Sequence, residues 1–228
     1  MKRIFTIVIA IIISSLSSFS QSNTGFTVGS NFSLLTGDST SLPDAIIKPG
    51  FYGGMFWDIN TGYKTYIQIG GFYSQQGGKY KYEYFDFGKK ITRTINNKID
   101  YVKIPLMWKQ VWGDWYTSIG LYGEIAAVSN SVWTERTQNV DTFFIKSDTL
   151  QSFTNDLRLY DTGFKLALGV QFPINSQYDF FMNIAYNHGF LAINPKAFRI
   201  ENKMYNRFFT INVGIIINSN SYKYRSRR

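Results

Sequence analysis

The sequence of 228 residues contains no cysteine and only one histidine. Without cysteine the chain has no disulfide framework, no thiolate metal site, no cysteine nucleophile and no lipid anchor on an N-terminal cysteine. Beyond residue 20 no apolar run reaches 18 residues, so no transmembrane helix is predicted there. Proline is scarce, at 5 residues, whereas aromatic residues make up 18% of the chain. These features favour a β-rich domain whose outer surface is not in contact with water.

The first 20 residues are typical of a secretory signal peptide. Lys2 and Arg3 precede an apolar run from Ile4 to Ile13, and Ser18-Phe19-Ser20 fits a cleavage site with small residues. A helix of ten residues rises only about 15 Å, whereas a bilayer core needs roughly 30 Å, so a membrane anchor is the weaker interpretation. Because an exported protein rarely meets nucleic acid, the formal net charge of +9 does not predict a nucleic-acid partner.

Alternating apolar and polar residues fill most of the chain after residue 24. In Tyr160–Phe172 the even positions are mainly large and apolar, and the odd positions are small, polar or charged. This period of two predicts β-strands. The expected strands are Gly25–Leu35, Gly50–Ile59, Thr65–Ser74, Ile99–Lys109, Trp115–Val128, Tyr160–Phe172, Tyr178–Phe190 and Phe209–Ile217.

The predicted connections alternate between short and long. The short ones are residues 60–64, 111–114 and 173–177, and the long ones are 36–48, 77–98, 130–159 and 191–207. Since the first and last connections are long, both ends of the barrel chain lie on the short-turn side, as in bacterial outer-membrane barrels. We therefore predict an all-β fold: a closed, eight-stranded, antiparallel, up-and-down transmembrane β-barrel over residues 21–217, with a basic tail at 218–228.

A soluble eight-stranded barrel with an apolar interior is the alternative fold. Its outer surface would carry the small, glycine-rich side of the strands, which offers few charges for solubility. The export signal and the alternating loop lengths instead favour an apolar outer face in lipid. Tryptophans near the predicted strand ends are then expected to form an aromatic girdle at the membrane interface. They are Trp57, Trp108, Trp112 and Trp115.

The Gly113-Asp114 pair predicts a two-residue turn, and this turn fixes the register of its flanking strands. In that register Lys103 lies opposite Glu124 on the inner face, with Cβ atoms about 4.5–5.5 Å apart. Lys165 on the next strand faces the same side, so we predict an internal ion-pair cluster of Lys103, Glu124 and Lys165. A structural plug of the narrow lumen is its simplest role, and a site for a small polar ligand or ion is the alternative.

Two of the long connections carry aromatic residues that are candidates for an outer contact surface for a protein or glycan. They are Tyr80, Tyr82, Tyr84 and Trp133. Packing on neighbouring strands and on lipopolysaccharide headgroups is the alternative. Phe85–Gly88 is expected to form the tip of a hairpin above the membrane. The Asn130–Leu159 segment has room for another hairpin, but Thr134–Gln138 is too polar to cross lipid.

His188, the single histidine, falls by parity on the lipid-facing side of its strand, near the outer end. An interfacial structural role is expected, because no serine or carboxylate has a spacing that ties it to His188 for hydrolysis. The sequence therefore predicts no catalytic residue, no cofactor and no metal site.

Short motifs in strand order resemble a known family. Asp100–Leu106 and Tyr116–Tyr122 contain an IPL…G.Y pattern, and glycine-marked segments occur at Gly50–Gly54, Asp161–Phe164 and Ala167–Val170. Together they resemble the PorT-like outer-membrane barrels of Bacteroidetes. The resemblance implies an eight-stranded outer-membrane barrel, and one namesake of the family contributes to type IX protein secretion. The basic tail beyond the last strand departs from a barrel that ends near its C-terminus.

Three functions follow as hypotheses. The first is a structural or protein-interaction barrel of the outer membrane, surrounded by lipid and lipopolysaccharide and contacting other envelope proteins in secretion or envelope biogenesis. The second is a small ligand-binding or narrow transport barrel that uses its polar lumen. The third, least supported, is an outer-membrane hydrolase.

Overall fold

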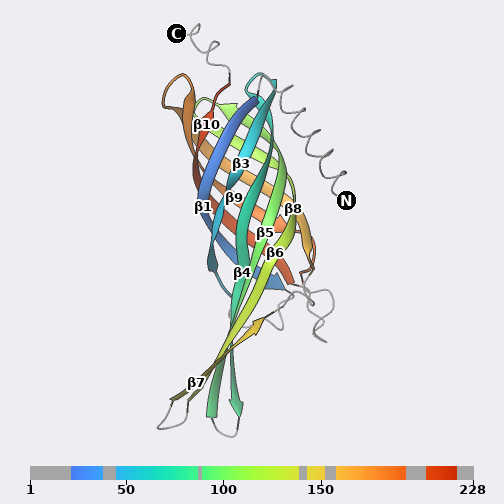
Figure 1. Cartoon of the computed structure of the whole chain (residues 1–228), viewed down its shortest axis with the longest axis vertical. Coiled ribbons are helices and arrows are strands. Elements are labelled where there is room, and N and C mark those ends of the chain that lie inside the picture. Colours follow the sequence, from blue (N-terminus) through green and yellow to red (C-terminus); the bar gives the residue numbers. More distant parts are fainter. Residues whose placement is uncertain are drawn as a thin grey trace, which may run out of the picture.

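The computed structural model describes residues 22–37, 45–86, 89–138, 143–151, 158–193 and 204–219. The predicted signal peptide and residues 220–228 of the predicted tail lie outside these ranges. Ten strands form one antiparallel sheet (Figure 1). They are β1 (Ser22–Gly37), β2 (Ala45–Ile46), β3 (Lys48–Gly62), β4 (Thr65–Asp86), β5 (Lys89–Trp112), β6 (Trp115–Gln138), β7 (Phe143–Gln151), β8 (Tyr160–Pro173), β9 (Tyr178–Gly189) and β10 (Met204–Ile217). Within the described ranges no helix is long and apolar enough to span a bilayer.

Eight of these strands close into a barrel. Pairing runs in the order β1, β3, β4, β5, β6, β8, β9 and β10, and β10 pairs with β1 to complete the ring. All of these pairs are antiparallel. The predicted eight-stranded, up-and-down barrel is therefore confirmed, and closure pairs the backbone of every barrel strand on both sides.

The turn between β5 and β6 has the predicted geometry. Gly113 has a φ of 60°, a left-handed conformation that glycine adopts without steric cost and that a two-residue hairpin requires. Trp112 pairs with Trp115, and Lys103 pairs with Glu124. The register predicted from this one turn is therefore confirmed over the barrel part of both strands.

Both ends of the barrel chain lie at the end with the short turns. Thr24 near the start of β1 pairs with Ile217 at the end of β10. The turns between β3 and β4 and between β8 and β9 close the same end, at residues 63–64 and 174–177. The opposite end carries the longer connections, as the alternation of loop lengths predicts.

Strands β4, β5 and β6 continue past the barrel at that opposite end, where β7 pairs with β6 (Figure 1). Asp86 pairs with Lys89, so Gly77–Asp86 and Lys89–Lys98 are the outer parts of β4 and β5. This pairing agrees with the hairpin expected around Phe85–Gly88, of which residues 87 and 88 lie outside the described ranges, whereas the predicted ends of the strands at Ser74 and Ile99 were wrong. Strand β6 runs through Thr134–Gln138, and β7 pairs back onto it. The second hairpin considered for this segment therefore exists, and it lies beyond the barrel. We call Gly78–Asp86, Lys89–Asn97, Ser129–Gln138 and β7 together the arm.

A local irregularity marks the base of the arm. The register of β5 against β6 shifts between Asp100 and Tyr101, which indicates a β-bulge. At the same level of β4, Gly77 has a φ of 131°. A Cβ at Gly77 would lie 2.0 Å from the carbonyl oxygen of Asn97, so only glycine fits there. Because bulges bend and twist a sheet, these features coincide with the change from curved barrel wall to protruding arm.

Candidate functional site

The two faces of the barrel strands have the reverse polarity of a soluble barrel. On β6, Leu121 points outward and is 60% exposed, whereas the next residue, Tyr122, points inward and is 3% exposed. Buried charged residues line the lumen: Asp58, Lys103, Lys109, Glu124, Asp161 and Lys165. A soluble carrier with an apolar interior and a polar exterior does not fit this distribution.

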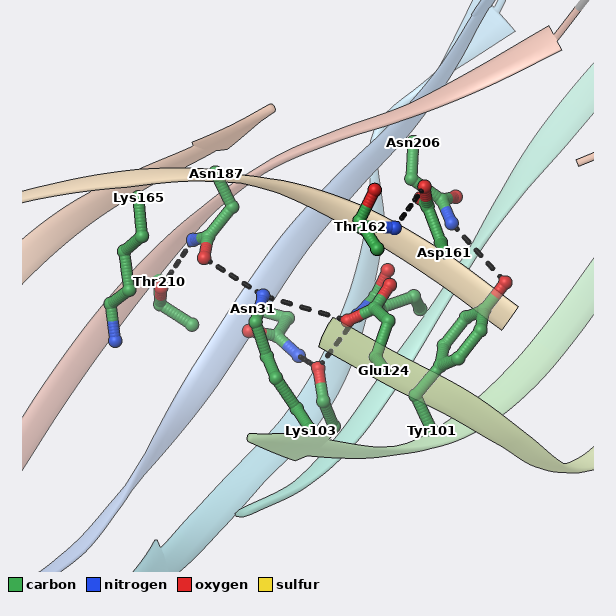
Figure 2. Close-up of polar contacts among 12 residues, drawn as sticks. Asn31, Tyr101, Lys103, Glu124, Asp161, Thr162, Lys165, Asn187, Asn206 and Thr210 are labelled. Carbon is green, nitrogen blue, oxygen red and sulfur yellow. Dashed lines mark hydrogen bonds and ion pairs between the residues drawn. The ribbon is translucent and has the colours of Figure 1, made fainter. Parts of the chain in front are cut away.

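Lys103 and Glu124 meet in the lumen, as shown in Figure 2. The Lys103 Nζ lies 3.5 Å from Glu124 Oε2, and neither side chain has any solvent exposure. The same ammonium donates a hydrogen bond to Asn187 Oδ1 at 2.9 Å and lies 3.4 Å from the centroid of the Tyr122 ring. Since a buried ammonium needs several partners, this lysine is held by β6 and β9 together.

A chain of hydrogen bonds extends from Glu124 to the other side of the lumen. Gln76 Nε2 donates to Glu124 Oε2 at 2.9 Å and to Ser74 Oγ at 2.9 Å. Asn31 Nδ2 donates to the same Ser74 Oγ at 2.9 Å. The network thus links β6, β4 and β1 across the lumen, which stiffens the barrel at this level.

Lys165 also points into the lumen but lies at a different level. Its backbone pairs with Gly120, whereas Glu124 pairs with Asp161. The Lys165 Nζ contacts the Tyr52 hydroxyl at 3.4 Å. Among the described residues no carboxylate lies within ion-pair distance of this ammonium. The structure therefore brings Lys103 and Glu124 together and places Lys165 in an aromatic environment.

A second buried ion pair lies nearer the short turns, and sequence reasoning missed it. Lys109 Nζ is 2.7 Å from Asp58 Oδ2, and both side chains are buried. Gln68 donates to the other oxygen of Asp58 at 2.8 Å, and Lys109 also donates to Gln171 at 3.2 Å. Parity already placed Lys109 inward. The short turn after β3 would have placed Asp58 opposite Gln68 of β4. Lys109 lies on β5, however, and this turn does not give the register between β4 and β5.

Large side chains also pack inside the lumen. They form one buried cluster: Tyr52, Phe56, Phe72, Tyr116, Phe181 and Ile216. A smaller cluster lies at the arm end: Leu35, Ile99, Tyr101 and Ile193. Buried ion pairs and aromatic clusters therefore share the interior, and the lumen is packed as in other narrow eight-stranded barrels.

The tryptophans predicted as a girdle lie on the outer face, in the half of the barrel nearest the short turns. Trp108, Trp112 and Trp115 are exposed, and Trp57 is half-buried. Trp112 and Trp115 pair across the turn. Their contact with a membrane interface stays a prediction.

The aromatic residues predicted as an outer contact surface all belong to the arm. Tyr80, Tyr82 and Tyr84 lie on β4, and Trp133 lies on β6. Ile95 of β5 pairs with Tyr80 on one side and with Trp133 on the other. The register therefore aligns aromatic positions of the two hairpins across neighbouring strands.

His188 lies on the outer face, away from the buried carboxylates. Its ring stacks on Phe164 with centroids 5.3 Å apart, and its Nδ1 lies 3.1 Å from the Tyr186 hydroxyl. Asp161, the buried carboxylate nearest in sequence, faces the lumen on the other side of the wall. This arrangement suits an interfacial structural role and assembles no general base beside a nucleophile.

Comparisons with known proteins find similarity at the level of solved structures. No protein-family model and no curated protein matches the chain. Ail, the attachment invasion locus protein of Yersinia pestis, aligns with 10% identity and a TM-score of 0.36, over 86% of this chain and 99% of that chain. Ail in complex with the heparin analogue sucrose octasulfate aligns with 13% identity and a TM-score of 0.39, over the same shares.

Neisserial surface protein A aligns with 12% identity and a TM-score of 0.38, over 85% of this chain and 96% of that chain. Alignments this distant carry no inference about function. The fold of this chain rests on its own strand pairing, and its site rests on its own lumen and arm.

Proposed function

We propose that the protein is an outer-membrane β-barrel that anchors the arm at the cell surface, where the arm binds other envelope proteins. The observation that carries this proposal is the continuation of β4, β5 and β6 far beyond the apolar wall, joined there by β7 (Figure 1). A barrel that only filled a membrane would need no such extension.

The outer wall has the polarity and height of a membrane-spanning surface. On β10 the outward residues from Phe209 to Ile217 are all apolar and exposed, and Arg207 comes next toward the arm. Eight steps along a strand cover about 27 Å, and a tilt of roughly 40° reduces this to about 20 Å along the barrel axis. Apolar bands of outer-membrane barrels are about 25 Å tall.

The packed lumen supports an anchoring role rather than transport. The Lys103–Glu124 and Lys109–Asp58 pairs are both buried, and a cluster of buried aromatic side chains packs in the same interior. Ions or solutes would have to displace paired charges and packed rings to pass. The surface available for recognition is therefore outside the barrel.

The arm offers unpaired strand edges for recognition. Within the described residues, β7 pairs only with β6, and the outermost part of β4, from Tyr82 to Asp86, pairs only with β5. Exposed edges present free N–H and C=O groups to which another protein can add a strand. An extended segment of an envelope protein is the partner that this geometry suits.

Two sequence features support this location and role. The N-terminal segment is typical of an export signal, and motifs in strand order resemble PorT-like barrels, which links the proposal to envelope biogenesis or protein secretion. Outer-membrane lipid and lipopolysaccharide would then surround the wall, with the Trp girdle on the periplasmic side.

Shortening both hairpins tests the proposal. Gly78 pairs with Asn97, and Ser131 pairs with Leu150, so each pair can be joined by a tight turn after deletion of the residues between them. A photo-crosslinking residue at Glu83 would report contacts of the full arm in cells. We expect discrete crosslinked protein products with the full arm and their loss when only the β6–β7 hairpin is shortened.

A crosslinking residue at Val128, on the outer wall near the base of the arm, serves as the matched control. Its products should not change when the arm is shortened. Heat-modifiable gel mobility would verify that each variant still folds as a barrel. Absence of any protein product at Glu83 in cells would contradict the proposal.

A polar-lumen function is the second candidate, because charged side chains are buried on the inner face of the barrel, among them Lys103, Lys109, Lys165, Asp58, Glu124 and Asp161. Conductance of the purified protein in planar bilayers distinguishes this function from the anchoring of the arm. A packed lumen predicts no steady current, and a reproducible single-channel current would favour narrow transport.

A further inference from the structure

Four buried oxygen atoms without a hydrogen-bond partner gather at the arm end of the lumen. They are Glu124 Oε1, Asp161 Oδ2, Asn206 Oδ1 and the Tyr122 hydroxyl. Each of these residues is at most 3% exposed. Since a buried polar atom without a partner is costly, the group calls for an explanation.

These oxygens come from β6, β8 and β10. Glu124 pairs with Asp161, so their carboxylates face the lumen side by side, and the Asn206 amide lies within hydrogen-bonding reach of Asp161 (Figure 2). The facing glycines at 163 and 189 leave space for the Tyr122 and Asp161 side chains. A Cβ at Gly163 would lie 2.5 Å from the Tyr122 hydroxyl, and one at Gly189 would lie 2.4 Å from Asp161 Oδ2.

The other oxygen of each carboxylate is already satisfied. Asp161 Oδ1 accepts hydrogen bonds from the backbone N–H of Thr162 at 2.7 Å and of Leu191 at 3.2 Å. Glu124 Oε2 receives Gln76 and lies near Lys103. What remains is two carboxylate oxygens and an amide oxygen, which only accept hydrogen bonds, and the Tyr122 hydroxyl, which can donate one. The missing partner of these acceptors is therefore a donor or a cation.

The charge balance favours a cation. Of the buried ammonium groups, Lys103 contacts Glu124, and Lys165 is held at the Tyr52 hydroxyl. Lys103 is thus the one ammonium beside these two carboxylates, because Lys165, whose charge would balance the second one, lies at a different level of the lumen. The local charge at the carboxylates is therefore negative. Buried charges persist in proteins when they are paired or bound to metal ions.

We propose that Glu124, Asp161 and Asn206, with the Tyr122 hydroxyl, bind a hard metal cation of the Ca²⁺ class inside the lumen. Carboxylate and amide oxygens are the ligands that such ions prefer. No three His, Cys, Asp or Glu side chains of the described residues come together as a metal group, so neutral oxygens complete this donor set. Lys103 approaches Oε2 of Glu124, which leaves Oε1 for the ion.

At this position a bound ion would contact several strands of the barrel at once. Its ligands come from β6, β8 and β10, and the Leu191 N–H joins the following loop to Asp161. Ile193 in that loop packs against Leu35, Ile99 and Tyr101. A bound ion would therefore tie three barrel strands and the loop together beneath an apolar cap. This inference does not depend on what the arm binds.

Terbium luminescence tests the proposal on the purified, folded protein. Tb³⁺ replaces Ca²⁺ at oxygen sites, and tyrosines within a few ångströms, here Tyr122, sensitise its emission. We expect a saturable signal that Ca²⁺ displaces. Asp161→Asn should weaken Tb³⁺ binding by at least the roughly tenfold that loss of an outer-shell partner causes. Asp114→Asn, which removes an exposed carboxylate at the β5–β6 turn, should leave the titration unchanged.

Elemental analysis of the wild-type protein keeps the test decisive if Asp161→Asn fails to fold. About one calcium ion per chain after dialysis, reduced in Glu124→Gln, supports the site. Equal Tb³⁺ titrations for wild type and Asp161→Asn, or neither bound calcium nor sensitised emission in the wild type, would overturn it. The oxygens would then be satisfied by water or by a proton shared between the carboxylates.

Discussion

Alternate residues of the same strands form the outer wall and the lumen of this barrel, and the two faces place different requirements on their side chains. On the wall, Leu121 and Ile125 are exposed to similar extents, 60% and 63%, and need only be apolar. In the lumen, charges are buried and form specific contacts, as in Lys109 with Asp58 at 2.7 Å. A surface in hydrocarbon requires only that its side chains be apolar, whereas a packed polar interior requires specific ion pairs and hydrogen bonds.

The largest expected effect comes from breaking a lumen pair. Asp58→Ala leaves the Lys109 ammonium buried with Gln171 as its remaining hydrogen-bond acceptor, and removing one partner of a buried ion pair costs about 3–5 kcal/mol. Urea unfolding of the barrel in lipid vesicles would measure the loss.

The double variant Asp58→Ala with Lys109→Met removes both charges and serves as its control. It should recover most of the stability, because no buried charge is left alone. A single variant within 1 kcal/mol of wild type would show that the pair is not buried as described.

The next largest loss of stability is expected for arginine substitutions at two depths of the outer wall. Leu121→Arg, in the middle of the barrel part of β6, should cost about 2–4 kcal/mol in lipid, whereas Ile125→Arg nearer the arm should cost about 0–1 kcal/mol. Both side chains point outward on the same strand, so only depth differs. Equal costs in vesicle unfolding would argue against a membrane around this wall.

Adding one methyl group at each of two glycines of β6 compares the inner and outer faces of that strand. A Cβ at the inward Gly120 would lie 2.0 Å from the Leu106 carbonyl oxygen, whereas at the outward Gly123 it would meet nothing within 4 Å. Gly120→Ala should therefore cost about 1–3 kcal/mol, and Gly123→Ala should change stability by less than about 0.5 kcal/mol. If Gly123→Ala lowered the urea midpoint of unfolding more than Gly120→Ala, the inner and outer faces of β6 would be the reverse of those described.

The smallest effect is expected in the arm. Lys81 and Lys90 each place an ammonium 2.8 Å from the Glu83 carboxylate, and their hydrogen bonds hold its pKa at about 2. Because this pKa is lowered, the contacts persist from pH 7 to pH 4 and are lost only as pH falls toward 2. Exposed ion pairs contribute little, so Glu83→Gln should leave the rate of limited proteolysis of the arm unchanged over that range. Faster cleavage of the variant at pH 7 would contradict this expectation.

The sequence predicted the barrel because apolar and polar residues alternate strictly along the wall strands. Apolar residues at every second position mark the wall on β8 and β10, and one tight turn at Gly113 sets the register that joins Lys103 to Glu124. Local chemistry sufficed there, since hairpin geometry depends on a few neighbouring residues.

The arm and the position of Lys165 could not be predicted in the same way. Tyr80, Tyr82 and Tyr84 alternate with charged residues, and a hairpin tip was expected at Phe85–Gly88. Outside the barrel neither face of a strand must be apolar, so this pattern did not show how far the paired strands extend. The register of β6 against β8 depends on connections too long to fix it, and it places Lys165 four residues from the partner of Glu124. The Asp58–Lys109 pair was missed for the same reason, because it crosses a long hairpin.

Fluorescence quenching by lipids with brominated chains tests the facing of the strands most directly. In protein whose 5 native tryptophans are replaced by phenylalanine, one new tryptophan is placed at Leu121 or at the adjacent Tyr122. We predict strong quenching of Leu121→Trp and little quenching of Tyr122→Trp. Equal quenching, or quenching of Tyr122→Trp alone, would contradict a barrel with hydrocarbon outside and a packed polar lumen within.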